Sequence, residues 1–489
     1  MIPPALAIFA WPFISAALFK RLSLPRALIW CVLGGYLFLP EIVALELPVL
    51  PPISKETIPS FSALLLVVYT TQAMRQTTLG RQAPNLDVQP GFLPKNKIML
   101  ILLIAAVIGA MLTALTNGDR LSTGGSPIPG LRPYDAGSMA MLTFVHFIPL
   151  LLARKYLASP DAHRTLLHVF LVAGLIYSLP VLWEVRLSPQ LNLQVYGFRA
   201  HSFRQHIRND GFRPMVFLNH GIWVGIFMSC AFVAALAYVK QAATQNRWKY
   251  ILAAGWLFLS IFVMNSLGAL LITTMMLLAI LFLPERLRML LIAGLAGTIL
   301  FYPMLRGSGV IPTEQAISVA ESINPLRADS LKFRLDNEDL LLEKANERPW
   351  FGWGGWNRNR VYDEEGQDLT TADGAWIILI GTRGWIGYLA EFGLLCGPLL
   401  LLFLRRRFYE PSPATTGLML VLCANLLDLI PNATLTPLTV LLAGALIGRL
   451  EWTGDRTKDL PKEDPTGRPW RSAYTRQLKR HVRTRKISI

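Results

Sequence analysis

Hydrophobic residues along this chain gather in long runs that shorter polar segments separate. The stretches IMLILLIAAVIGAMLTALT (98–116) and SLGALLITTMMLLAILFL (266–283) contain no charged residue. Uncharged apolar runs of about 18 residues or more are long enough to cross a bilayer as helices. The pattern therefore predicts an all-α polytopic membrane protein.

The apolar runs predict thirteen membrane spans. They lie near residues 4–19, 27–44, 58–74, 97–116, 136–153, 165–184, 214–238, 249–264, 266–283, 288–304, 384–404, 413–430 and 434–449. The first run starts at Pro3, with no basic stretch before it and no small-residue cleavage site. We therefore interpret it as a span and not as a removable signal peptide.

Basic residues predict which side of the membrane each loop faces. They follow every second span, as Lys20 and Arg21 follow the first and Arg154 and Lys155 the fifth, and they also fill the C-terminal tail. The positive-inside bias makes these loops cytoplasmic, with the N-terminus outside and the C-terminus inside. The predicted organisation is N-terminal spans (1–184), a basic outside loop (185–213), central spans (214–304), a large outside loop that carries short helices (305–383), C-terminal spans (384–450) and a basic cytoplasmic tail (451–489).

Composition supports this class and locates the excess charge. Of the 489 residues 53% are hydrophobic and 16% charged, whereas about a quarter of a globular chain is charged. The tail after Leu450 has eleven Lys/Arg and five Asp/Glu, so it supplies +6 of the net +16, and we expect it to lie against anionic lipid and not to bind nucleic acid. Four cysteines lie in apolar runs without metal-ligand spacing and are predicted to be buried free thiols: Cys31, Cys230, Cys396 and Cys423.

The two long outside loops carry many arginines against the positive-inside bias, which indicates that the arginines have a function. In the first loop they are Arg186, Arg199, Arg204, Arg208 and Arg213, and in the second they include Arg327, Arg334, Arg358, Arg360 and Arg383. A guanidinium group pairs its donors with phosphate or carboxylate oxygens and stays charged at any working pH. Together they would hold a polyanionic headgroup, above all a diphosphate; the alternative is a solvated loop facing acidic lipid.

The second loop also contains PWFGWGGWNRNR (349–360), which combines tryptophans, glycines and arginines. Trp356 and Trp376 are candidates for stacking on a sugar ring, although tryptophan in membrane proteins more commonly anchors at the interface. The glycines permit a tight turn. We interpret this segment as the turn that carries the outer loop over a lipid headgroup, with Arg358 and Arg360 facing the ligand.

The stretch TTADGAWIILIGTRGWIG (370–387) places Asp373 just before an apolar helical run, where an N-cap belongs. A second interpretation makes Asp373 a general base or orienting carboxylate at the mouth of a basic pocket. Both hold together, because a carboxylate at a helix start stays ionised.

The ionisable residues of the predicted spans also favour the outer edge. At about 1.5 Å per residue, His220, Glu391 and Asp428 fall within roughly 10 Å of the outer ends of their helices, while His146 lies near mid-span. Transporters place charged groups near the midplane. This distribution favours an enzyme acting at the outer surface over a transporter.

The order of these motifs resembles the core of the O-antigen ligase and O-antigen polymerase family of envelope proteins. FRLDNEDLLLEKANERPWFGWGGWN gives the family's Arg, as Arg334, then a helix and a Pro-x-Phe-Gly-x-Gly-like turn. GFRPMVFLNHGIWVG (211–225) is similar to the family's Arg before an Asn-containing span, as Arg213, and MNSLGALL (264–271) to the start of another conserved span. Asp373 and Gly374 stand where ligases carry His-Asn, so a polymerase is favoured over a ligase.

The resemblance implies a GT-C-like glycosyltransferase of the bacterial inner membrane, working at its outer face. Its donor would be an undecaprenyl-diphosphate-linked oligosaccharide and its acceptor a growing glycan, with inversion and with neither metal nor cofactor. Catalysis would rest on Asp373, Arg334 and Arg213. Substrate binding would involve Arg199, Arg204, Arg208, His220, Arg327, Trp356, Arg358, Arg360, Trp376 and Arg383.

Alternatives from other classes remain open at this point. They are a ligase that attaches the glycan to a lipid or protein, a transporter of an anion or lipid-linked glycan, and a scaffold for other polysaccharide assembly proteins, which are further partner candidates. A family core that hosts several functions does not decide among them.

Overall fold

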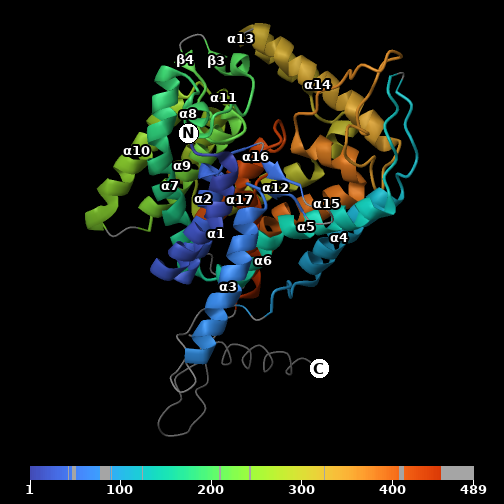
Figure 1. Cartoon of the computed structure of the whole chain (residues 1–489). Helices are drawn as coiled ribbons and strands as arrows, with labels where there is room; N and C mark the ends of the chain where they lie inside the picture. The colour runs from blue at the N-terminus through green and yellow to red at the C-terminus, as the bar shows by residue number, and fades with distance from the viewer. Residues whose placement is uncertain are drawn as a thin grey trace, which may run out of the picture. The chain divides into compact units, whose positions relative to one another are not determined.

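The computed structural model of the chain describes residues 1–41, 43–46, 51–77, 89, 91–123, 125–208, 211–241, 244–323, 325–406 and 412–452. The chain divides into two units, Met1–Glu451 and Trp452–Ile489. The predicted basic tail thus lies outside the described residues except for its first two. The first unit is built of helices, with two small two-stranded antiparallel sheets in its described part (Figure 1).

The prediction of a helical membrane protein is confirmed. Six stretches of the described chain are long and apolar enough to cross a membrane: α4 (Lys97–Leu115), α5 with α6 (Pro133–His146 and Ile148–Tyr156), α7 (Pro160–Leu187), α9 (Gly221–Val239), α12 (Glu285–Gly307) and α15 (Ala375–Leu404). The other predicted spans coincide with α1 (Pro4–Arg21), α2 (Leu24–Phe38), α3 (Ile58–Thr77), α10 (Arg247–Val263), α11 (Leu267–Phe282), α16 (Pro413–Asp428) and α17 (Pro437–Glu451). That all thirteen cross the membrane stays a prediction.

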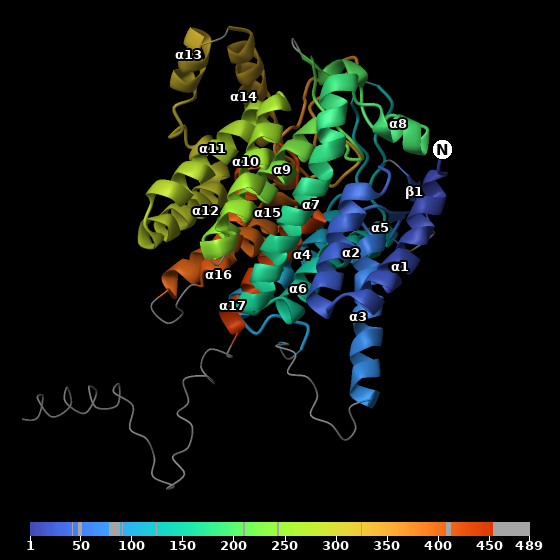
Figure 2. The ribbon, with the colours of Figure 1, turned by 90° about the vertical axis from the view of Figure 1, so that its left-hand side faces the viewer.

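Helix α9 lies at the centre of the packing. It contacts α7, α10, α11 and α16, and Figures 1 and 2 both show it next to α7 and α10. Its sequence, GIWVGIFMSCAFVAALAYV, is apolar on all sides, which is typical of a helix surrounded by other helices. The surrounding helices therefore hold α9, with its N-terminus capped by His220, in place.

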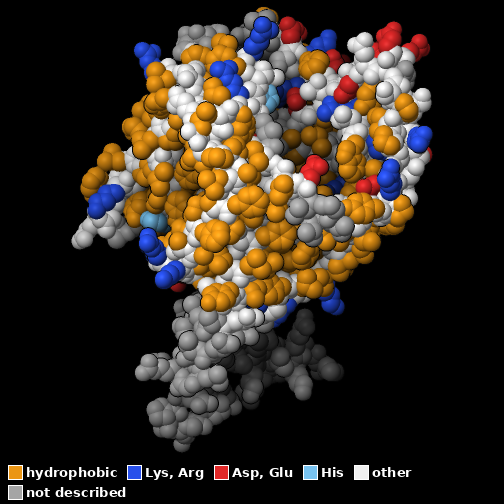
Figure 3. Space-filling model, viewed as in Figure 1, with side chains coloured by type: hydrophobic (Ala, Val, Ile, Leu, Met, Phe, Trp, Pro, Cys, Tyr) orange, Lys and Arg blue, Asp and Glu red, His pale blue; other side chains and the backbone are white. Residues whose placement is uncertain are grey.

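Large apolar side chains also cover the outside of the molecule. Figure 3 shows hydrophobic side chains over the middle of one face, while charged side chains gather along its upper edge. Phe13 is 78% exposed and Phe282 74%. Apolar surface of this extent is what a membrane protein presents to lipid. The four cysteines are buried and form no disulfide, as predicted.

The segment after α7 is ordered by one buried carboxylate. It contains α8 (Leu191–Tyr196), a 3₁₀ turn (Phe203–His206) and the hairpin of β3 (Ile207–Arg208) and β4 (Gly211–Phe212). Glu184, at the end of α7, accepts hydrogen bonds from the backbone N–H groups of Leu191 (2.9 Å), Met215 (2.8 Å) and Val216 (2.7 Å). This side chain therefore pins both ends of the basic loop to α7. A second hairpin, β1 (Ala44–Leu45) with β2 (Ile53–Ser54), precedes α3.

The segment predicted to form the large outside loop (305–383) is mostly helical at its start. It holds α13 (Thr313–Ile323) and α14 (Pro325–Asn346), so one of its helices is longer than the short helices predicted. Arg306, at the end of α12, binds α14 through Asp339 (2.7 Å) and lies 3.8 Å from Glu338. Burial raises the pKa of Glu338 to about 7. These contacts fix α14 over the end of α12.

Helix α15 begins at Ala375, nine residues before the predicted span, and is broken at Gly384. There the backbone takes φ 66° and ψ −172°, which only glycine adopts readily. The turn from PWFGWGGW packs into this break: Trp385 N donates to Pro349 O (2.7 Å) and Trp353 N to Gly381 O (2.8 Å). A Cβ on Gly384 would lie 2.4 Å from the carbonyl carbon of Trp350. The turn therefore packs into the break in α15, and its predicted place over a lipid headgroup stays a prediction.

Candidate functional site

A cavity of about 580 Å³ brings together the three residues predicted to be catalytic. Arg213 comes from the segment after β4, Arg334 from α14, and Asp373 from the residues before α15. The remaining lining residues are mostly polar or aromatic: His201, Gln205, Asn219, His220, Ile222, Trp223, Ala372, Asn432, Ala433 and Thr434. Segments more than 150 residues apart in sequence therefore meet at one hollow, as the two-loop prediction required.

Arg334 and Asp373 form an ion pair in the wall of this cavity. The Nε of Arg334 lies 3.3 Å from Oδ2 of Asp373, and both side chains are 38% exposed. The Nη1 of Arg334 also points to the carbonyl of Pro431 at 3.5 Å. An arginine and a carboxylate, both reachable from solvent, can bind an anion and a hydroxyl group side by side.

The prediction that Asp373 caps the following helix is wrong. The N-cap residue is Gly374, and no side chain caps the helix. The N–H of Ala375 instead donates to the carbonyls of Leu429 (3.0 Å) and Asn432 (3.2 Å). Because backbone carbonyls satisfy the helix start, the carboxylate of Asp373 turns to Arg334 and the cavity.

Gly374 packs closely against the α16–α17 connection. A Cβ at this position would lie 2.3 Å from the carbonyl oxygen of Ile430, closer than side-chain carbons come. A residue with a side chain therefore cannot fit this backbone without a shift, and the glycine lets the α16–α17 connection pack against the start of α15.

Arg213 reaches the cavity through close contact with α9. Its backbone N–H donates to the carbonyl of His206 (2.8 Å), which extends the β3–β4 hairpin, and its Nη2 lies 3.5 Å from the carbonyl oxygen of Asn265. A Cβ on Gly221 would lie 2.3 Å from Cγ of Arg213. The glycine that begins α9 thus makes room for this arginine.

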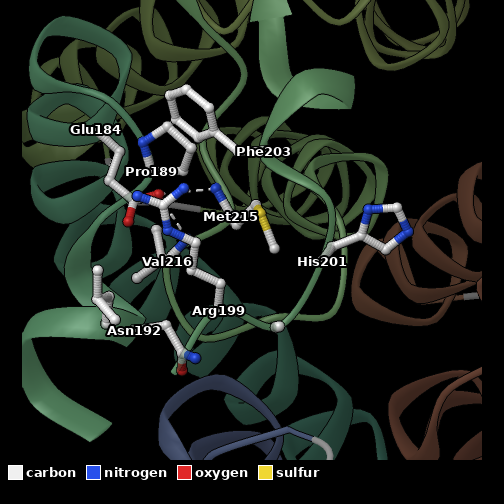
Figure 4. A pocket seen from close by; sticks show the side chains of 10 residues that line it. Glu184, Pro189, Asn192, Arg199, His201, Phe203, Met215 and Val216 are labelled. Carbon is white, nitrogen blue, oxygen red and sulfur yellow. Dashed lines mark hydrogen bonds between the residues drawn. The ribbon is translucent and has the colours of Figure 1, made fainter. Parts of the chain in front are cut away.

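Arg199 and Arg204, two of the other arginines predicted in the first loop, do not line this cavity. Arg199 lines a small pocket with Glu184 and Met215, and its guanidinium lies 4.8 Å from the ring of Phe203 (Figure 4). Arg204 is exposed in the 3₁₀ turn. The side chains of Arg208, in β3, and Arg327, in α14, lie outside the described residues. Of the described side chains, neither that of Arg199 nor that of Arg204 lies beside Asp373.

Arg358, predicted to bind the ligand, is held by contacts within the protein instead. Arg358 is buried and donates to the carbonyls of Trp353 (3.0 Å) and Pro129 (2.8 Å) and to the backbone of Asp119 (3.0 Å). The hydrogen bond from Arg348 holds the pKa of Asp119 below its ordinary range, so the carboxylate stays charged beside Arg358. This differs from the predicted arrangement, in which Arg358 faces the ligand.

The remaining predicted residues lie apart from the Asp373 cavity. Trp356 is 65% exposed in a left-handed turn conformation, and Arg360 donates to the carbonyl of Thr370 (2.7 Å). Trp376 is fully buried against Tyr302, with ring centroids 5.1 Å apart. Burial leaves its ring no face for a sugar.

Arg383 lines a second cavity, of about 400 Å³, between α3, α5 and α15. There it lies 3.9 Å from Glu391, whose other oxygen is 3.0 Å from Nε2 of His146. The two predicted intramembrane groups, His146 and Glu391, are thus partners. Ala433 lines both cavities, so they lie on two sides of the α16–α17 connection.

Sequence reasoning missed several cavity residues. Asn219, Trp223 and Asn432 line it, and so does His201, which lies close to His206 and His220. The stretch LNHGIW (218–223) was predicted to begin a span, and of its polar residues only His220 was predicted to bind substrate. Asn432 follows α16 in a connection whose packing sequence alone does not show. The sequence matches no protein-family model and no curated protein.

Proposed function

We propose that the protein is a polysaccharide polymerase that transfers a glycan from an undecaprenyl-diphosphate-linked donor to a sugar hydroxyl at the outer face of the inner membrane. The observation that carries this proposal is the convergence of Arg213, Arg334 and Asp373 on one cavity. The substrate class is taken from the resemblance of the sequence to the O-antigen polymerase family.

The charges of the cavity suit this donor. Arg213 and Arg334 bring two positive charges and Asp373 one negative charge, so these three contribute +1. A glycosyl lipid diphosphate carries two negative charges, which guanidinium donors bind in pairs. Asn219, Asn432 and Thr434 add amide and hydroxyl groups that can hydrogen-bond sugar hydroxyls.

In the transfer, the acceptor hydroxyl attacks the anomeric carbon of the donor from the side opposite the phosphate. The bond between that carbon and the phosphate oxygen breaks, and the lipid diphosphate leaves with the electron pair, its charge stabilised by Arg213 and Arg334. The hydroxyl proton passes to Asp373 and then to water. The product is inverted at the anomeric carbon, and no metal takes part in making or breaking bonds.

The test is reconstitution of the purified protein in liposomes with a lipid-diphosphate-linked oligosaccharide and no ion gradient. We expect the oligosaccharide to lengthen, and to stop lengthening in Arg334→Ala and Asp373→Ala. A ligase would instead require lipid A or a protein acceptor. Transport of the unchanged oligosaccharide across the bilayer, with no lengthening, would overturn the proposal.

A further inference from the structure

Three histidines gather at the edge of the cavity. His201 precedes the 3₁₀ turn (Phe203–His206), His206 is the last residue of this turn, and His220 caps α9. Ring centroids lie 4.6 Å apart for His206 and His220, 4.9 Å for His201 and His220, and 5.7 Å for His201 and His206. One nitrogen from each ring lies within 4.8 Å of those of the other two.

The hydrogen bond of His206 sets its ring for ligation. Its Nδ1 lies 3.2 Å from the carbonyl oxygen of Arg213, and because a carbonyl only accepts, Nδ1 is the protonated nitrogen and Nε2 holds the lone pair. His206 is fully buried. Histidines that bind metals characteristically donate their second ring N–H to a carbonyl or carboxylate, which orients the ring.

His201 supplies a second nitrogen that the described chain leaves unsatisfied. Its Nδ1 is buried and has no hydrogen-bond partner among the described residues. A buried polar atom without a partner is costly and calls for an explanation. In Figure 4 the imidazole points away from Glu184, and the residue also lines the cavity of Asp373.

His220 couples the cluster to α9. Its Nδ1 accepts the N–H of Ile222 at 3.1 Å, which is the helix cap, so Nε2 carries the hydrogen in this state. For Nε2 to bind an ion, the hydrogen must sit on Nδ1 instead, and Nδ1 can then no longer accept the N–H of Ile222. The ion would therefore replace this hydrogen bond as the contact that holds the imidazole.

We propose that His201, His206 and His220 bind one Zn²⁺ ion. Within the described segments the group offers three imidazoles and no carboxylate, a set that suits Zn²⁺ and disfavours Mg²⁺ or Ca²⁺. Zinc bonds to nitrogen of about 2.0 Å place tetrahedral ligands about 3.3 Å apart, so the rings close by about 1.5 Å on binding. The fourth position faces the cavity that His201 and His220 line.

The ion has a structural consequence for the site. It ties the hairpin to the N-terminus of α9, and Arg213 follows directly, with its N–H and carbonyl both bonded to His206. Bound zinc would thus hold Arg213 at the cavity wall. The binding proposal itself stands apart from the proposed function, because it needs no glycan.

The test uses the full chain purified in detergent without a histidine tag. After chelator treatment and addition of Zn²⁺, we expect about one ion per chain by elemental analysis, and a rise in the unfolding temperature. His201→Ala and His220→Ala should lose the ion, whereas the matched control His168→Ala, a half-buried histidine of α7, should keep it.

A second measurement does not depend on the variants. Co²⁺ added to the wild-type chain should give the intense visible absorption of a tetrahedral nitrogen site, displaced by Zn²⁺. Absence of a stoichiometric ion, binding that survives both variants, or a Co²⁺ spectrum of the octahedral aqueous type would overturn the proposal.

Discussion

Replacing Asp373 with Asn separates a chemical role of this carboxylate from a structural one. The substitution removes the charge and keeps the shape, so it breaks the ion pair with Arg334 at 3.3 Å. Both side chains are 38% exposed, and exposed pairs contribute about 0–1 kcal/mol to stability after screening. We therefore expect the unfolding temperature to change by no more than about 2 °C.

The expected loss of activity is much larger. A positioned general base contributes about 10²- to 10⁴-fold to a rate, equivalent to roughly 3–5 kcal/mol. If Asp373 accepts the proton of the acceptor hydroxyl, Asp373→Asn should lower the rate of glycan lengthening by at least about 100-fold. The assay is the reconstituted lengthening reaction, run beside thermal unfolding of the same preparation.

Asp368→Asn is a matched control. Asp368 forms a similar pair with Arg360, at 3.6 Å and 37% exposed, and it does not line the Asp373 cavity. The charge-swapped double variant, Arg334→Asp with Asp373→Arg, restores opposite charges but not the chemistry. Activity in the swapped protein, or a rate within about threefold of wild type in Asp373→Asn, would refute the reasoning.

Three further predictions concern folding. Gly384→Ala places a Cβ within 2.4 Å of Trp350 at a positive φ, so it should destabilise the fold by several kcal/mol. Its yield and unfolding temperature should both fall. The control Gly255→Ala, with open space around the new Cβ, should be neutral. Burial raises the pKa of Glu338 from an ordinary 4.5 to about 7, so its neutral form favours folding below about pH 4.5 and that stability, on the order of 3 kcal/mol, is lost as pH rises through 7. Glu338→Gln should remove the fall in unfolding temperature between about pH 4.5 and 7; an unchanged pH profile would contradict this assignment. Glu184→Ala leaves three backbone N–H groups without their acceptor, so limited proteolysis should cut the 185–213 segment faster, and unchanged cleavage would argue against it as the anchor.

The long apolar helices were predictable because a membrane helix is encoded locally. A run such as 98–116 contains no charged residue, and its composition alone identifies α4. The start of α15 was not predictable in the same way. Its first N–H is satisfied by carbonyls of Leu429 and Asn432, and its break at Gly384 exists because a turn 30 residues earlier packs into it. Both depend on contacts that no local pattern contains.

The candidate site was predictable only in part, for a related reason. The predicted topology places the two basic loops on one side of the membrane. Arg213, Arg334 and Asp373 were therefore predicted to act at one site. An arginine that binds a ligand and one that binds backbone carbonyls have the same sequence signature, so the buried Arg358 could not be told from Arg334. The three-histidine cluster was missed because His201 and His206 meet His220 only through the hairpin.

The position of Asp373 depends on backbone contacts more than on its ion pair. The N-terminal part of α15 is held at its start by carbonyls of the α16–α17 connection, and at Gly381 and Thr382 by N–H groups of the turn at Trp353 and Gly354. None of these bonds involves a side chain of the cavity. Removing the charge of Asp373 should therefore leave its backbone in place, and a large loss of activity in that variant would report on the carboxylate itself.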